Sequence, residues 1–158
     1  MNYNSNTNLN FNPNSNNNSS LNLPKRVCIK QKNLLQLGYS NLEEWLKNPN
    51  NLYVGRRGRI FIGSGTEKRV FFYPQSKWGN PYKIKDHPNI TIDNLILLYK
   101  QHLITSGLIN QIDELLNKNI GCFCDLKDRC HTDVLISNLS EKYPQLNRND
   151  SDSIFHFV

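Results

Sequence analysis

Hydrophobic and polar positions along the chain predict short strands. The predicted strands are residues 25–30, 52–54, 59–62, 69–73 and 120–124. Glycine-containing turns separate the second, third and fourth, which suggests a meander of neighbouring strands. The last is a short apolar run typical of a buried strand. Because side chains alternate along a strand, Cys122 and Cys124 are expected on one face and Phe123 on the other.

Four other segments show the spacing of amphipathic helices: residues 41–47, 92–103, 108–116 and 132–139. Ser40 and Glu43 form a capping-box pattern ahead of the first. Cys130 and His131 are expected to open the last. A thiol at the start of a helix lies near unpaired backbone N–H groups and the positive end of the helix dipole, so a lowered pKa is expected for it.

Polar segments flank these elements and set the expected domain organisation. Residues 1–23 are mostly Asn and Ser without a charged side chain, and such a tract cannot bury enough apolar surface to fold. A disordered Asn-rich tail is therefore expected there, followed by a single domain over residues 24–147. Alternating strands and helices predict a small α/β domain with a short mixed sheet and packed helices. Residues 148–158 form a polar C-terminal tail.

Composition narrows the classes of protein to consider. No apolar run approaches the roughly 18 residues of a membrane span, and the N-terminus lacks the pattern of a signal peptide, so we expect no membrane partner and a cytoplasmic protein. The net charge is +6, yet residues 1–90 hold thirteen Lys or Arg against four Asp or Glu. This basic half favours a phosphate-bearing partner such as a nucleotide or nucleic acid.

Three of the four cysteines cluster near the C-terminal end of the predicted domain. Cys122, Cys124, Cys130 and His131 offer the atoms that bind zinc, although their C-x-C-x5-C-H spacing differs from paired C-x2-C knuckles. Alternatively, Cys130 or Cys124 is a reactive thiolate with His131 as its proton shuttle. In a third interpretation the thiols are small core residues. The spacing leaves all three open.

A second group of candidates lies in a turn-rich loop over residues 74–82 and in the arginine-rich turn before it. The candidate phosphate- and base-binding residues are Arg56, Ser76, Lys77, Trp78 and Asn80. Lysine beside an aromatic ring suits a phosphate and a stacked base. Equally, Trp78 and Tyr82 could be hydrophobic plugs beneath the turn. The arginines could likewise belong to an ordinary solvated turn.

Together, the YVGR, SKWGNPY and GCFC…CH…VL motifs resemble those of an uncharacterised family of small bacterial, phage and large-DNA-virus proteins, domain of unknown function 4326. The resemblance covers about residues 52–139 and implies a site but no settled activity. If the chain is viral, its setting is the host-cell cytoplasm or the virion. By resemblance, the motif positions are Gly55, Arg56, Ser76, Lys77, Trp78, Gly79, Asn80, Pro81, Cys122, Cys124, Cys130, His131, Asp133 and Leu135.

Two functional hypotheses follow. In the first, the domain binds or processes a nucleotide or nucleic-acid phosphate, with Arg56 and Lys77 on the phosphate and Trp78 stacked on a base. Cys130 and His131 would then carry any chemistry. In the second, zinc stabilises a non-catalytic interaction module. The first requires the loop over residues 74–82 to lie beside the start of the last helix.

Overall fold

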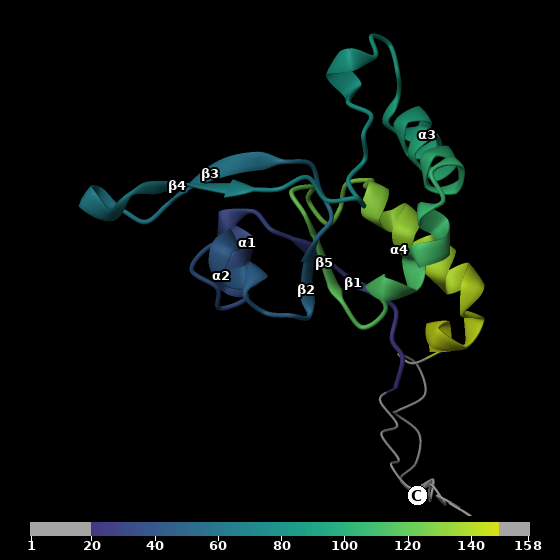
Figure 1. The fold of residues 1–158 in the computed structure, drawn as a ribbon, viewed down its shortest axis with the longest axis horizontal. Helices are drawn as coiled ribbons and strands as arrows, with labels where there is room; N and C mark the ends of the chain where they lie inside the picture. Colours follow the sequence, from purple (N-terminus) through teal and green to yellow (C-terminus); the bar gives the residue numbers. More distant parts are fainter. Residues whose placement is uncertain (1–19, 149–158) are drawn as a thin grey trace, which may run out of the picture.

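A three-stranded parallel sheet lies between two sets of helices in the computed structural model (Figure 1). Its strand order is β1 (Lys25–Cys28), β5 (Asn119–Cys122), β2 (Asn51–Tyr53). The central strand β5 pairs in parallel with both neighbours. In this register, Asn119 is level with Lys25 on one side and with Asn51 on the other. All three strands therefore end at the same edge of the sheet.

The structure describes residues 20–148. The Asn-rich tail expected over residues 1–23 and the polar tail expected over residues 148–158 lie outside this part of the chain, except for their innermost residues. Leu23 already packs against the core. Among residues 20–148, none of the helices combines the length and the apolar composition of a membrane span.

Strands β3 (Gly58–Ile62) and β4 (Arg69–Tyr73) form a separate antiparallel hairpin that projects from the domain as an arm (Figure 1). The fold class is thus the predicted α/β domain with parallel and antiparallel strands. The expected meander is wrong in one respect, because β2 pairs with β5 and not with β3. That pairing joins segments far apart in the chain, which a local hydrophobic pattern does not reveal.

The helices and 3-10 helices of the two layers are α1 (Gln31–Gln36), α2 (Leu42–Leu46), α3 (Ile92–Thr105), η3 (Leu108–Leu115) and α4 (His131–Lys142). Short 3-10 turns η1 (Gly65–Glu67), η2 (Ile84–Asp86) and η4 (Pro144–Arg148) complete the fold. The predicted α2, α3 and α4 are confirmed, α1 was not predicted, and the segment after α3 is a 3-10 helix.

The cap of α2 also differs from the prediction. Asn41 caps it by accepting a hydrogen bond from the backbone N–H of Glu44, while the Ser40 hydroxyl and amide bind the Glu44 carboxylate. The capping box is therefore shifted by one residue along the chain. An asparagine at this position is as good a cap as serine, so the sequence pattern alone did not separate the two.

Alternation along β5 decides which layer each side chain meets. A Cβ at Gly121 would lie 2.6 Å from the Trp45 ring and 2.7 Å from Ile29, so only glycine lets β5 approach the α1/α2 layer this closely. Ile120 belongs to the core on the opposite side, beneath α3 and α4. By the same alternation Cys122 faces the α3/α4 layer.

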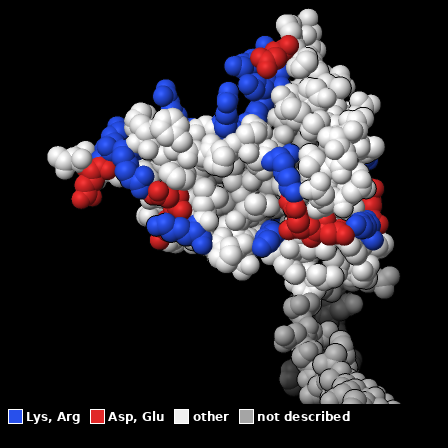
Figure 2. Space-filling view, in the orientation of Figure 1, with Lys and Arg blue, Asp and Glu red and all other residues white. Residues whose placement is uncertain are grey.

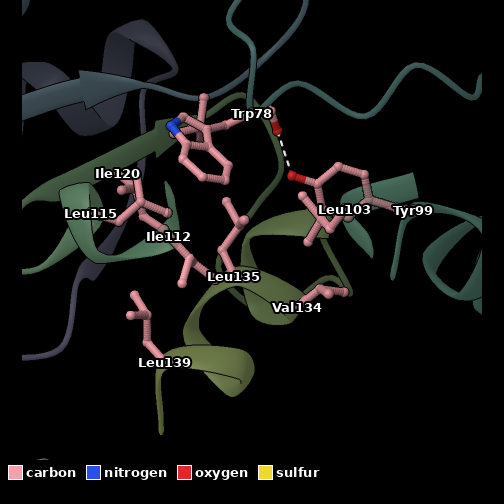
Figure 3. Close-up of a cluster of buried hydrophobic side chains, with 10 residues drawn as sticks. Trp78, Tyr99, Leu103, Ile112, Leu115, Ile120, Val134, Leu135 and Leu139 are labelled. Carbon is pink, nitrogen blue, oxygen red and sulfur yellow. Dashed lines mark hydrogen bonds between the residues drawn. The ribbon is translucent and has the colours of Figure 1, made fainter. Parts of the chain in front are cut away.

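Trp78 is buried in the core that the sheet forms with α3, η3 and α4 (Figure 3). The Tyr99 hydroxyl donates a hydrogen bond of 2.6 Å to the Trp78 carbonyl, and the indole Nε1 donates one of 2.7 Å to Glu114. Gly79 packs against the end of β2, since a Cβ there would meet the Gly55 carbonyl oxygen at 2.6 Å. The 74–82 loop is thereby fixed to three elements.

We predict that Trp78→Ala lowers the free energy of unfolding by about 3–5 kcal/mol, because it removes a large buried ring and leaves a cavity. Trp78→Phe, which keeps a ring and loses the bond to Glu114, should cost less. Denaturant unfolding of the three proteins measures the difference. Equal stability of Trp78→Ala and the unchanged protein would contradict the central packing role of the indole.

Candidate functional site

Three cysteine thiols converge where β5 ends and α4 begins. Cys122 ends β5, Cys124 follows two residues later, and Cys130 is the N-cap residue of α4. Their sulfur atoms all lie within 4.8 Å of one another, and the Cys122 and Cys124 sulfurs are 3.6 Å apart. Cys122 and Cys130 are buried, whereas Cys124 is half-buried. The predicted clustering of these three residues is therefore present in the structure.

The thiols differ in acidity because they share hydrogen bonds. Donation from Cys122 and Cys124, followed by the interaction with His131, lowers the pKa of Cys130 far below that of an ordinary thiol. The hydrogen bonds of Cys122 to Cys124 and Cys130, together with burial, raise the pKa of Cys122. These contacts favour the thiolate form of Cys130, at the N-terminus of α4, over that of Cys122.

His131 is held between the cluster and the sheet. Its Nδ1 lies 3.4 Å from the Cys130 sulfur, and its Nε2 lies 2.7 Å from the carbonyl oxygen of Val54. A carbonyl only accepts, so Nε2 donates a hydrogen bond to Val54 and Nδ1 faces the Cys130 sulfur. The four predicted metal ligands therefore divide into three sulfurs that converge and an imidazole that contacts the cluster through Cys130.

Arg26 on β1 binds the loop between Cys124 and Cys130 and holds it against the strand. Its guanidinium donates to the Asp133 carboxylate at 2.9 Å and to the backbone carbonyls of Asp125 and Asp128 at 2.7 and 2.9 Å. Sequence analysis missed this residue. The available signal was its place on the strand face opposite Val27, where a charged side chain points toward α4 and needs partners.

A pocket of about 490 Å³ opens at the carboxyl ends of β2 and β5, in front of the thiols and His131. This is the edge where ligands bind in parallel α/β sheets. Arg56, Arg57 and Arg129 line it, and no Asp or Glu does. Arg129 also pairs with Asp93 on the exposed side. Figure 2 shows Lys and Arg along the edge between the hairpin and the loop leading into α3.

The predicted phosphate- and base-binding residues are split between this pocket and its surroundings. Arg56 and Asn80 line the pocket together with the thiols. Ser76 and Lys77 line a neighbouring hollow to which Arg56 also contributes. The Lys77 ammonium group there donates to Gln111 and to the carboxylate of Glu114. Of the five predicted residues, only Arg56 lines both hollows, and Arg57 lines both beside it.

Trp78 is only 1% exposed and lies in the core, so its indole has no free face on which a base could stack. This corrects the predicted stacking role and agrees with the alternative of a hydrophobic plug. The 74–82 loop still lies near the three thiols and His131. The Tyr99 hydroxyl donates to the Trp78 carbonyl, and the Tyr99 ring packs edge-on against His131 with the ring centroids 5.2 Å apart. Rings that do line the pocket include Tyr73 and Tyr82, which sequence analysis did not assign to a ligand.

Comparison with known proteins identifies relatives without a described activity. The profile of the family described as domain of unknown function (DUF4326) matches residues 39–141. An uncharacterized protein of Acanthamoeba polyphaga mimivirus is 34% identical over 93 residues, which are 53% of this chain and 70% of that protein. No solved structure matches the chain. The match covers the thiol cluster, the pocket arginines and the 74–82 loop, but β1 with Arg26 precedes it.

We predict that Arg26→Met lowers the free energy of unfolding by about 1–2 kcal/mol, because three partly exposed charge-assisted hydrogen bonds are lost. The freed loop should also make Cys130 react faster with an alkylating reagent, as followed by peptide mass spectrometry. Lys25→Met, at the exposed neighbouring position of the same strand, is the matched control. Identical Cys130 labelling in both variants would show that Arg26 does not position the thiol.

Proposed function

The chain belongs to the family described as domain of unknown function (DUF4326), and we propose that its three convergent thiols bind a zinc ion at the floor of a ligand pocket. The mutual approach of the Cys122, Cys124 and Cys130 sulfurs carries this proposal. Zinc–sulfur bonds of about 2.3 Å place sulfur atoms of a tetrahedral site roughly 3.8 Å apart. The 3.6 Å between Cys122 and Cys124 fits such a site.

The surroundings of the cluster support a metal ion there. The ligands come from the end of β5, from the loop that follows it and from the N-terminus of α4, whose dipole favours thiolate over thiol at Cys130. Arg26 fixes the connecting loop, so the sulfurs are already close together. Three protein ligands leave a fourth position, as in zinc sites that bind a water or a substrate. A zinc ion there would polarise an oxygen atom of a ligand in the pocket.

The lining of the pocket favours a second function, binding of a nucleotide or another phosphate ester. Guanidinium groups of Arg56, Arg57 and Arg129 surround the pocket without a carboxylate among the lining residues. Arginine forks bind phosphate oxygens in pairs, and the rings of Tyr73 and Tyr82 offer surfaces for a planar base. A volume of about 490 Å³ is in the range of small-molecule sites.

The same thiols support a metal-free alternative for the chemistry of the site. Cys130 would be the nucleophile and His131, 3.4 Å away, its base, with the Val54 carbonyl orienting the ring. The half-buried Cys124 would then be a hydrogen-bonding partner of that thiolate and not a metal ligand. Zinc and the free nucleophile exclude each other, because a bound ion occupies the sulfur lone pairs. Metal content therefore separates them.

We expect the purified protein to hold one zinc ion per chain, measured by inductively coupled plasma mass spectrometry. Cys122→Ala, Cys124→Ala and Cys130→Ala should each lose it, and a chelator should lower the thermal unfolding midpoint of the unchanged protein. Cys28→Ala removes the buried thiol that lies outside the cluster and should retain the ion. Protein produced with added zinc that contains none, and whose stability does not respond to zinc, would refute the proposal.

We further expect nucleotides to raise the thermal unfolding midpoint, less so as salt increases, because the arginine charges are screened. Arg56→Gln should weaken the affinity for the best nucleotide about tenfold, since it removes charge-assisted bonds to phosphate. Isothermal titration calorimetry gives the two affinities. Lys47→Gln, an exposed change at the end of α2, serves as the control. Equal affinities of both variants would exclude Arg56 as a phosphate ligand.

A further inference from the structure

The outer face of the β3–β4 hairpin exposes large apolar side chains. Phe61 is 65% exposed and Phe72 is 69% exposed, and Val70 is exposed beside them. The strand register places Phe61 opposite Val70 and Arg59 opposite Phe72, so all four lie on one face of the ribbon. We call these four residues the outer hairpin face. No other part of the described domain covers these rings, and an exposed apolar patch of this kind is typical of a binding surface.

The opposite face of the hairpin supplies its attachment to the domain. Ile60, Phe71 and Tyr73 pack against the core cluster that contains Trp45. Arg69, on the same side, forms an ion pair with Glu43. The outer hairpin face is therefore not required to hold the arm in place. Its two phenylalanines need another explanation.

Positive charge accompanies these rings. Lys68 lies over the Phe61 ring, with its Nζ 5.0 Å from the centroid, and Arg57 and Arg59 lie at the base of the hairpin. Glu67 is the acidic residue of the hairpin segment. Arg57, Arg59 and Phe72 line a shallow groove, and Figure 2 shows Lys and Arg side chains along the arm. The surface thus combines exposed aromatic rings with cations, one of which, Lys68, already lies against Phe61.

We propose that the outer hairpin face binds single-stranded nucleic acid. Phe61 and Phe72 are diagonal neighbours across the two strands, about 7–8 Å apart, which allows each to stack on a different base. Arg59 lies directly opposite Phe72 and two residues before Phe61 on the same face, where its guanidinium can reach the phosphate that links the bases. An uncharged apolar partner would gain nothing from the cations of the hairpin. Single-stranded nucleic acid would contact the cations through its phosphates and the phenylalanine rings through its bases.

The groove beside this face leads toward the thiol pocket. Arg57 and Tyr73 line both hollows, so a strand lying on the hairpin would pass the mouth of the pocket. The proposal nevertheless rests on the hairpin residues and does not require zinc or a mononucleotide in the pocket.

Fluorescence anisotropy with labelled 15-nucleotide oligo(dT) and oligo(U) tests the proposal on the full chain. We expect binding that weakens as salt is raised, because Lys and Arg release counterions from the phosphates. The double variant Phe61→Ser/Phe72→Ser should raise the Kd about tenfold or more, since each ring stacks on a base. Arg59→Gln should raise it severalfold and reduce the salt dependence.

The matched control is Leu97→Ser/Ile104→Ser, which removes two exposed apolar side chains from α3 instead. It should bind like the unchanged protein. If the phenylalanine variant does not fold, as judged by circular dichroism, Arg59→Gln decides the question. Zinc content is measured on the same samples, so either proposal can fail without the other.

Three results would overturn the inference. The first is the absence of oligonucleotide binding by the unchanged protein, and the second is equal affinities of the hairpin and α3 variants. The third is binding to vesicles rich in phosphatidylserine without binding to oligonucleotides, which would assign the same cations and rings to an anionic membrane surface.

Discussion

The Arg26 guanidinium makes the interaction on which the rest of the site depends. It places a nearly buried cation between the Asp133 carboxylate and the carbonyls of Asp125 and Asp128. A buried charge is tolerated only where such partners surround it, so the loop cannot move away without leaving that charge unpaired. The loop in turn fixes the start of α4, and with it the sulfur of Cys130 beside those at the end of β5.

The 74–82 loop has a structural role that its motif did not disclose. Trp78 fills the core while its carbonyl accepts from Tyr99, and the Tyr99 ring contacts His131. The indole therefore acts on the site indirectly, by fixing the neighbours of the imidazole. A conspicuous aromatic residue in a loop is in this case part of the packing. The side chains that line the pocket instead include arginines and tyrosines.

Local patterns predicted much of the architecture. Alternation predicted that the Cys122 and Cys124 side chains lie together, and their sulfurs are 3.6 Å apart although β5 ends at Cys122. The spacing of apolar residues located α3 and the hairpin strands. Parallel pairing of β2 with β5 escaped prediction because its partners lie 68 residues apart. The role of Arg26 was missed for a similar reason, since its three acceptors follow about a hundred residues later. Long-range contacts leave no periodic trace in the chain.

Within the described residues, β3 and β4 pair only with each other, so each strand has one edge whose backbone groups lack a neighbouring strand. Such edges invite pairing with another copy of the same ribbon. Here Arg57, Arg59 and Lys68 make two approaching arms repel one another. A polyanion that neutralises these charges would remove the barrier to self-association. The tendency of this protein to self-associate through the hairpin therefore depends on the anions that surround it.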